Sequence, residues 1–492
     1  MKWILNNKLL LVILLLGLLF RTYNFEKGFS FAHDQDLYSW IAKDIVMNKH
    51  IRSVGQITSV DGVFIGPFYY YLMALFYGIF NMNPMSAIIP LTFIGLFNIW
   101  SFYYLGKTYF TKRIGLTMCF FYAISWGCAS FDRWSVPTQP TITWCIWYLF
   151  LILGMLKGRI KLLPLYGLLI GFLWHIHIAL LPIIPIPVIA YLLSKGSLGI
   201  KIKKIYWKNL VVSILLFFVV SAPFWFFELK YHFSQVNGVM AAMKITNLGP
   251  TGYLKLLKVL EASASEFRIR IFNGWNFADI KFLWYLLIGI FVFLQLFRRI
   301  AWKQSLCVWM WIFLILLAQF TSKKQVSEYY FTNLVPIYIL FLVIFVDYFL
   351  LFKYLKYVFY VFMFVYLGVN MWWLKNNSFS NESYFERRQL VDYIKNDSIS
   401  KNYPCIAINY ISSPGTGVGF RYLFWYYGVK LIKPNNNIPI YNIIIPWNMN
   451  EKETVAKFGR FGVIPPDNTE NIKPELCESK LFEMDPLLGY TE

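Results

Sequence analysis

Apolar runs of about 20 residues, separated by short basic segments, recur over most of the first 375 positions of this 492-residue chain. A helix of that length crosses the hydrocarbon core of a bilayer and satisfies its own backbone hydrogen bonds there. Because 58% of the residues are hydrophobic, a soluble fold is excluded. The sequence therefore predicts an all-α polytopic membrane domain.

The runs predict about eleven spans. They lie near residues 3–20, 86–106, 114–131, 140–156, 162–178, 179–194, 209–227, 283–297, 306–320, 334–351 and 358–374. The first run has a basic flank at Lys2 but no small-residue cleavage site before Arg21, so we expect it to remain as an anchor helix.

The net charge of the chain is +21, and the Lys and Arg residues that give rise to it lie mostly in the connections between spans. With the N-terminus in the cytoplasm, every inside connection is basic, as the positive-inside rule requires. These connections are residues 107–113, 157–161, 195–208, 298–303 and 353–356. The charge thus sets orientation in a plasma (inner) membrane of the cell envelope and argues against nucleic-acid binding. The outside then receives residues 21–85, 132–139, 228–282, 321–333 and everything from 375.

The first outer loop, 21–85, contains two candidate helices outside the spans. Leu37, Ile41 and Ile45 recur at helical spacing and predict a short amphipathic helix along the membrane surface. Residues 67–80 are apolar but short, and making them a span would invert all later loops. We expect them to form a second helix packed at the interface.

The character of the chain changes near residue 375, which divides a membrane domain (1–374) from a tail (375–492). The tail predicts a small extracytoplasmic α/β domain. Its expected elements are helices at 384–396 and 420–428 and strands at 405–411 and 438–445. Cys405 and Cys477 are the only cysteines there; an oxidising compartment would let them pair, but spacing alone does not decide this.

An acidic motif, Phe-Ala-His-Asp-Gln-Asp-Leu-Tyr-Ser-Trp at 31–40, follows the first span. A carboxylate pair at the mouth of a membrane helix bundle is a functional-site hypothesis. Asp34 and Asp36 share a face if the segment is extended and diverge if it is helical. The alternative is that one of them caps the helix that follows.

The order of motifs resembles the GT-C glycosyltransferases, specifically the protein O-mannosyltransferase and aminoarabinose-transferase branch (families 39 and 83). The resemblance covers roughly the first 340 residues. It rests on the acidic motif, on Ile-Gly-Pro-Phe-Tyr-Tyr-Tyr-Leu at 65–72, on the polar segment 130–137 and on Glu-Tyr-Tyr at 328–330. It implies an inverting enzyme that moves a sugar, a hexose or a pentose, from a polyprenyl-phosphate donor to an outer-face acceptor. Whether the acceptor is protein, lipid or glycan stays open.

The resemblance also implies roles for three aspartates. Asp34 is the candidate base that takes the acceptor's proton, and Asp36 is its alternate or orienting partner. Asp132 lies where the family carries a second functional polar position. The other interpretation is that Asp132 only pairs with Arg133 at a helix end.

The family usually has a lysine just before its Pro-aromatic stretch to hold the phosphate, but this chain has Ile65-Gly66-Pro67. The candidate substitutes on the outer side are Arg52, Arg133, Lys323, Lys324, Arg268 and Arg270, with Tyr329 close to the lysines as a further substrate contact. The favoured pair is Lys323 and Lys324; the alternative is that they bind lipid headgroups only.

His175 and His177 are two positions apart, so on a helix they point some 200° apart and cannot easily share a metal ion. We expect one to line the cavity while the other is a satisfied interfacial histidine. No cofactor is required by the resemblance; a divalent cation held by Asp34 and Asp36, as in the related oligosaccharyl transferases, is the alternative.

Two further segments invite interpretation. Residues 414–419 fail the glycine spacing of a dinucleotide fingerprint and predict a tight turn. The outer loop 228–282, with Leu254, Leu257 and Leu260 at helical spacing, is expected to cover the cavity. Two rival functions remain: a transporter or flippase for lipid-linked glycans, which predicts polar residues through the bundle midplane, and a non-catalytic scaffold.

Overall fold

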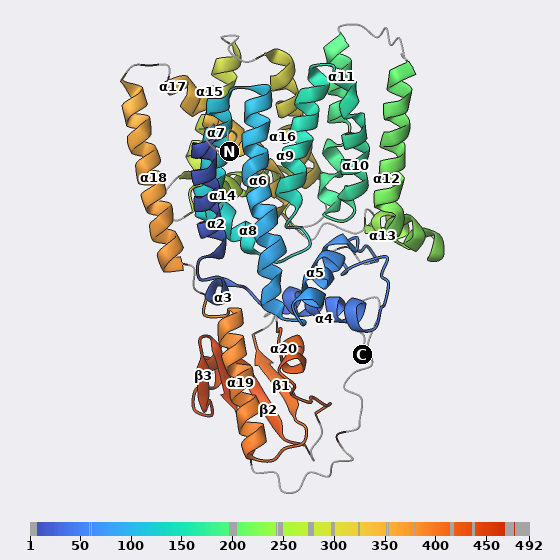
Figure 1. Cartoon of the computed structure of the whole chain (residues 1–492), viewed down its shortest axis with the longest axis vertical. Helices are drawn as coiled ribbons and strands as arrows, with labels where there is room; N and C mark the ends of the chain where they lie inside the picture. Colours follow the sequence, from blue (N-terminus) through green and yellow to red (C-terminus); the bar gives the residue numbers. More distant parts are fainter. Residues whose placement is uncertain are drawn as a thin grey trace.

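The structure is a computed structural model. It describes residues 7–58, 60, 62–195, 204–242, 244, 249–273, 280–296, 301–322, 325–350, 352, 354–377, 380–413, 418–434, 438–467 and 477. A helical bundle occupies one end of the molecule and a small α/β domain the other, with the first outer loop between them (Figure 1).

Every apolar run of the sequence forms a helix. The bundle consists of α2 (Lys8–Thr22), α6 (Ile88–Tyr109), α7 (Lys112–Ile124), α8 (Trp126–Arg133), α9 (Thr141–Leu156), α10 (Leu163–Leu173), α11 (Ile186–Lys195), α12 (Lys204–Lys230), α15 (Ile280–Leu296), α16 (Trp302–Thr321), α17 (Val335–Phe349) and α18 (Leu355–Asn377). Within the described residues, five helices are long and apolar enough to cross a membrane, or six if the bent pair α7–α8 counts as one span. The chain is thus an integral membrane protein, and the number of eleven spans stays a prediction.

The bent pair α7–α8 brings polar residues into the bundle. The two helices meet at an angle of 65° around Ser125, whose side chain accepts a hydrogen bond from the Cys128 amide at 3.3 Å and so caps α8. Helices α6 and α7 approach closely, because a Cβ on Gly106 would lie 2.4 Å from the Cα of Gly115. Small residues therefore permit this helix crossing.

The ends of the helices are arranged as alternating spans require. Helix α11 ends, α12 begins, α17 ends and α18 begins at the end of the bundle opposite the α/β domain (Figure 1). The helix ends that flank two of the basic connections thus lie at one end, while the first loop and the tail domain lie at the other. Which of these ends faces the cytoplasm stays a prediction.

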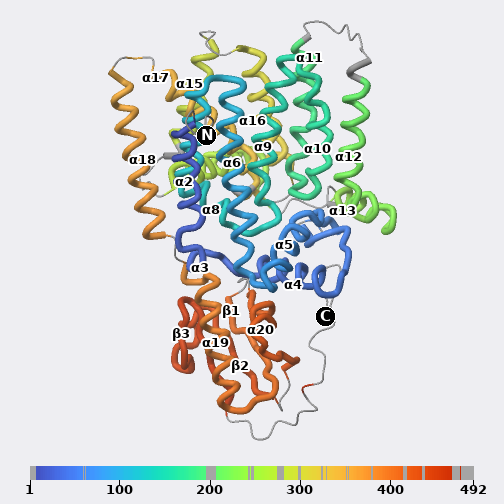
Figure 2. Tube along the Cα trace, viewed as in Figure 1, coloured from blue at the N-terminus to red at the C-terminus, as the bar shows by residue number. Residues whose placement is uncertain are grey.

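The first outer loop contains α3 (Phe25–Gly28), α4 (His33–Met47) and α5 (Phe68–Ile79). Both predicted helices are present, but the expected surface position of α4 is wrong. Its residues from Gln35 to Ala42 are all buried, because α5 covers one side and α20 of the tail domain covers another. Figure 2 shows these segments, far apart in the sequence, lying side by side.

The tail domain contains α19 (Tyr384–Ser400), α20 (Arg421–Tyr426) and a four-stranded sheet of order β1-β2-β4-β3. The two predicted helices and two predicted strands are present, with β1 (Ala407–Ser412) parallel to β2 (Ile440–Ile445). β3 (Ala456–Phe458) and β4 (Phe461–Ile464) complete the sheet as an antiparallel hairpin. Cys405 and Cys477 form a disulfide with a Cα–Cα distance of 5.8 Å.

The large outer loop differs from its prediction. It forms α13 (Ser234–Ala242) and α14 (Gly252–Ile271), but Leu254 and Leu257 of α14 are exposed. The buried face of α14 instead carries Val259, Glu266 and Phe267. The remaining short helices are η1 (Pro84–Ala87), η2 (Ile160–Leu162), η3 (Ile178–Ile183), η4 (Glu328–Leu334) and η5 (Trp447–Asn450).

Candidate active site

A cavity opens between the first outer loop and the bundle, and we name it the Asp34 cavity. It has an empty volume of about 720 Å³. Its lining residues come from the start of α4, the 56–65 loop, the segment after α8 and the segment before η3: Asp34, Gln56, Ile57, Thr58, Ile65, Trp134, Val136, Pro137, Thr138 and His177. Asp34 is the only carboxylate among these lining residues.

A second, smaller cavity lies next to the first and shares walls with it, and we name it the Tyr330 cavity. Trp134, Thr138 and His177 line both. The other lining residues of the Tyr330 cavity are Phe131, Thr141, Ala179, Leu180, Tyr330, Thr332 and Asn333. None of the described residues that line either cavity comes from α13 or α14. The described part of loop 228–282 therefore does not cover the cavity as expected.

The first turn of α4 directs Asp34 toward the Asp34 cavity. Gln35, not an aspartate, caps this turn: its Oε1 accepts the Ala32 amide at 2.9 Å. The Gln35 Nε2 donates to the Ser135 carbonyl at 2.7 Å and ties α4 to the cavity wall. Burial raises the pKa of Tyr70 on α5, and the charge of Asp34 adds to that rise. Asp34 thus lines the Asp34 cavity, close enough to Tyr70 for its charge to act on that hydroxyl.

Asp36 points the other way, as two residues on a helix must. Its carboxylate accepts the Tyr422 amide at 2.7 Å, at the start of α20, and its side chain is buried. The predicted capping of the helix that directly follows is therefore wrong, because Asp36 accepts an amide of α20 instead. Asp36 lines neither the Asp34 nor the Tyr330 cavity, so its prediction as an alternate base is not supported by its position.

The different directions of Asp34 and Asp36 also decide whether the two carboxylates can share a divalent cation. An ion shared by Asp34 and Asp36 does not fit, because Asp36 is held under α20 while Asp34 faces the cavity. Among the described residues, no three His, Cys, Asp or Glu side chains group as metal ligands. We derive no catalytic step through a metal.

Asp36 provides a prediction about pH. Burial raises its pKa to about 6, against the opposing effects of the Tyr422 amide and of Arg421 and Arg387. Since the folded state then binds the proton more tightly than the unfolded state, the free energy of unfolding falls as pH rises from about 4 to about 6, by up to roughly 3 kcal/mol. Asp36→Asn removes this dependence. Melting curves of both proteins between pH 4 and 8 test it; parallel curves would contradict it.

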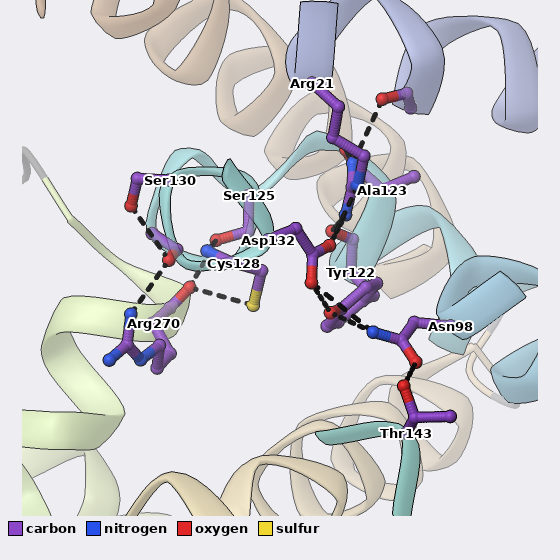
Figure 3. A network of polar contacts seen from close by, with 12 residues as sticks. Arg21, Asn98, Tyr122, Ala123, Ser125, Cys128, Ser130, Asp132, Thr143 and Arg270 are labelled. Atoms are coloured by element: carbon purple, nitrogen blue, oxygen red, sulfur yellow. Dashed lines mark hydrogen bonds and ion pairs between the residues drawn. The ribbon is translucent and has the colours of Figure 1, made fainter. Parts of the chain in front are cut away.

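Asp132 lies in a buried polar network rather than in a cavity (Figure 3). Its carboxylate pairs with the Arg21 guanidinium at 2.6 Å. It also accepts the Tyr122 hydroxyl at 2.7 Å and the Asn98 amide at 3.3 Å. The alternative prediction, an ion pair between Asp132 and Arg133, is wrong because Asp132 pairs with Arg21 of α2 instead. The position of Asp132 indicates a structural role.

Two cationic candidates are likewise held by other groups. The Arg52 guanidinium lies 3.3 Å from the Asp44 carboxylate, which also contacts His50. The Arg270 guanidinium lies 2.6 Å from Glu266 and also donates to the Gly127 carbonyl. Neither Arg52 nor Arg270 lines the Asp34 or Tyr330 cavity.

One histidine is buried and the other lines the cavities, as expected, but the predicted reason is wrong: α10 ends at Leu173, and His177 has an extended backbone. His175 is buried, with Nε2 at 2.8 Å from the Val220 carbonyl. A Cβ on Gly66 would lie 2.4 Å from its Nδ1, so the imidazole occupies the space that a side chain would need just before Pro67. His177 lines both cavities, and its Nδ1 accepts the Ala179 amide at 3.0 Å.

Some candidates lie outside the described residues. These are Lys323 and Lys324, the side chains of Glu328 and Tyr329, and residues 414–417 of the predicted turn. Arg268 is described and half-buried near the end of α14, and it does not line either cavity. The role of the lysine pair stays a prediction.

Sequence reasoning missed Trp134, Thr138 and Asn333. Trp134 is 39% exposed although it lies at the centre of the site. Asn333 is buried and its Oδ1 has no hydrogen-bond partner among the described residues. Trp134 and Thr138 follow directly after Asp132 in the segment that the sequence did single out, which was the available signal.

A helical membrane bundle, a first outer loop with an acidic motif and a small tail domain at the same end form an arrangement that solved membrane proteins share. Residues 65–226 match the family model described as dolichyl-phosphate-mannose-protein mannosyltransferase. That match spans a third of the chain, and its N-terminal boundary falls at the Ile-Gly-Pro motif.

Solved structures extend the similarity to nearly the whole chain. ArnT from Cupriavidus metallidurans bound to undecaprenyl phosphate has a TM-score of 0.60 and 11% identity, and the match covers 93% of this chain and 98% of that one. The oligosaccharyltransferase of Archaeoglobus fulgidus in complex with Zn and sulfate has a TM-score of 0.50 and 12% identity, covering 91% and 68%. A sequence comparison with curated proteins finds no match. At these identities the likeness establishes the fold.

Proposed function

We propose that this protein is an inverting glycosyltransferase that moves a sugar from a polyprenyl-phosphate donor to an acceptor at the outer membrane face. The observation that carries the proposal is the position of Asp34, the only carboxylate among the described residues that line the two adjacent cavities. The fold shared with ArnT, which binds undecaprenyl phosphate, supports a lipid-phosphate donor. The family match supports sugar transfer. The N-terminus is then cytoplasmic and the tail domain outside.

The chemistry requires one base and little else from the protein. The Asp34 carboxylate takes the proton of an acceptor hydroxyl or amine as that atom attacks the anomeric carbon. The bond from the anomeric carbon to the phosphate oxygen breaks, and the lipid phosphate leaves with the electron pair. Because attack comes from the face opposite the phosphate, the anomeric configuration inverts. A phosphate is a good leaving group, so no general acid is needed.

The remaining walls suit a sugar ring. Trp134 presents an exposed indole where the two cavities meet, and an aromatic face can stack on the apolar face of a sugar. Around it lie the hydroxyls of Thr138 and Thr332, the His177 ring and the Asn333 side-chain oxygen, which lacks a partner among the described residues. These groups donate to or accept from sugar hydroxyls.

Trp134→Ala is expected to raise KM for the donor roughly tenfold with a smaller change in kcat, because it removes a stacking surface and leaves the base in place. Trp134→Phe keeps an aromatic face and is expected to stay within about threefold of wild type. Steady-state transfer kinetics measure both. A loss of kcat with unchanged KM would place Trp134 outside sugar binding.

A donor panel tests the proposed reaction. Purified protein is reconstituted with polyprenyl phosphates carrying single labelled hexoses or pentoses and with extracts of envelope acceptors. We expect one donor to give labelled product, with the opposite anomeric configuration by NMR of the released glycoside. A retained configuration would contradict direct displacement.

A further inference from the structure

A third cavity lies beside the first two, and we name it the Arg133 cavity. It has an empty volume of about 490 Å³. Its walls come from the end of α8, from α3 and its following segment, and from the connection between α18 and α19: Gly28, Ser30, Trp126, Ser130, Arg133, Trp134, Asn377 and Ser380. It therefore lies where the bundle meets the tail domain, and it shares only Trp134 with the Asp34 cavity.

Arg133 lines this cavity, and no carboxylate among the described residues pairs with it. The side chain is 5% exposed and is held near the rings of Phe25 and Trp126, each 5.6 Å from the guanidinium carbon. Nη2 makes a long hydrogen bond of 3.4 Å to the Asn24 carbonyl, and the buried Nη1 has no hydrogen-bond partner among the described residues. The neighbouring carboxylate, Asp132, is committed to Arg21.

Such an arrangement is costly without a ligand. A buried charge without a counter-ion is destabilising, and the two neighbouring aromatic rings offset this only in part. None of the described residues that line the cavity is acidic, so the lining supplies no counter-charge to Arg133. An anion in the cavity beside the guanidinium would supply it.

The lining polar groups are suited to phosphate oxygens. Ser380 already accepts the Glu382 amide at 3.2 Å, which leaves its hydroxyl proton available to donate. The Asn377 amide and the Ser30 hydroxyl lie on the same walls, and both residues are exposed at the mouth. A planar guanidinium with neighbouring hydroxyl donors is typical of phosphate recognition.

The surroundings favour a phosphate attached to a lipid. Helix α2 leads into α3 and helix α18 ends at Asn377, so both helices end beside the cavity. Both expose large apolar side chains away from it, including Leu15 on α2 (57% exposed) and Phe364 on α18 (77%). Figure 1 shows α18 at the outer edge of the bundle, with its lower end near α3. A chain lying along these helices would place its headgroup at the mouth.

We propose that the Arg133 cavity binds the phosphate group of a membrane lipid, at a site distinct from the Asp34 cavity. The source is either a polyprenyl phosphate or a bilayer phospholipid, since both present the same phosphate chemistry below an apolar chain. The site joins the bundle to the tail domain, so an occupied site links the two. This inference does not depend on the proposed transfer reaction.

The test compares lipids with and without phosphate. Full-length protein, purified and delipidated in a neutral detergent, is titrated with dioctanoyl phosphatidylglycerol and dioctanoylglycerol, and with undecaprenyl phosphate and undecaprenol. Native mass spectrometry and the melting temperature report binding. We expect a phosphate-bearing lipid to bind and stabilise while its phosphate-free partner does not. Binding of undecaprenyl phosphate alone that Arg133→Gln weakens identifies the carrier lipid as the source; binding of both phosphates that Arg133→Gln weakens identifies any lipid phosphate.

Matched variants assign the binding to Arg133. Arg133→Gln is expected to weaken phosphate-lipid binding roughly 10- to 100-fold, the range for a lost charged hydrogen bond. Arg133→Lys keeps the charge and retains part of the affinity. Arg388→Gln, an exposed arginine paired with Glu26 on the same side of the molecule, is the control and binds as wild type. Equal binding of phosphate-bearing and phosphate-free lipids by wild type would overturn the proposal even if Arg133→Gln fails to fold, as would unchanged affinity in Arg133→Gln.

Discussion

Asp34→Asn is expected to lower kcat for sugar transfer by roughly 10²- to 10⁴-fold, the usual contribution of a positioned general base. The amide has nearly the same shape as the carboxylate but does not accept the acceptor's proton. Since Gln35 and not Asp34 caps α4, the fold and the donor affinity should be retained. Single-turnover transfer in reconstituted vesicles, with donor binding measured separately, gives the two quantities.

Asp36→Asn is the matched control, two residues away on the same helical turn. The asparagine carbonyl can still accept the Tyr422 amide that Asp36 accepts now, and Asp36 lines neither the Asp34 nor the Tyr330 cavity. Its transfer rate should stay within about threefold of wild type. If Asp36→Asn lost as much activity as Asp34→Asn, the base would have to be reassigned.

Asp132→Ala is expected to destabilise the protein by about 3–5 kcal/mol, because it leaves the buried Arg21 guanidinium without its counter-charge. The Tyr122 hydroxyl and the Asn98 amide lose an acceptor as well. Figure 3 shows that these partners converge from different helices, so the loss should loosen the packing of α2 against α7 and α8. The melting temperature of the purified variant measures it.

A double variant separates charge balance from a catalytic role of Asp132. Arg21→Met with Asp132→Leu removes both charges and should recover most of the lost stability, as replacement of buried pairs by apolar residues often does. Transfer per folded molecule should then be close to wild type. An Asp132→Ala protein with unchanged melting temperature but no transfer would instead make Asp132 a member of the active site.

The sequence predicted the helices well because hydrophobic length and periodicity are local properties. Each apolar run became a helix, and the tail elements followed from short amphipathic and β-branched segments. Strands β3 and β4 were missed because segments of three and four residues carry too little pattern. The burial of α4 was missed because α20, which covers it, lies almost 400 residues away in the sequence.

The candidate site was predictable where local geometry decides it. The expectation that one of His175 and His177 lines the cavity is confirmed, although α10 ends at Leu173 and the two do not lie on a helix as assumed. Asp132 was ambiguous because its partner, Arg21, is 111 positions away. Trp134 was not singled out because aromatic residues make up 20% of the chain, so one tryptophan carries no distinctive signal.

The most direct measurement of the central claim follows both the sugar and the lipid in one vesicle experiment. Vesicles containing the protein receive a polyprenyl-phosphate sugar labelled on the sugar and on the lipid, together with acceptor. The account predicts that wild type moves the sugar to the acceptor and leaves the lipid phosphate behind, and that Asp34→Asn binds the donor but moves no sugar. Intact labelled donor crossing the bilayer without transfer would contradict the account and identify a flippase.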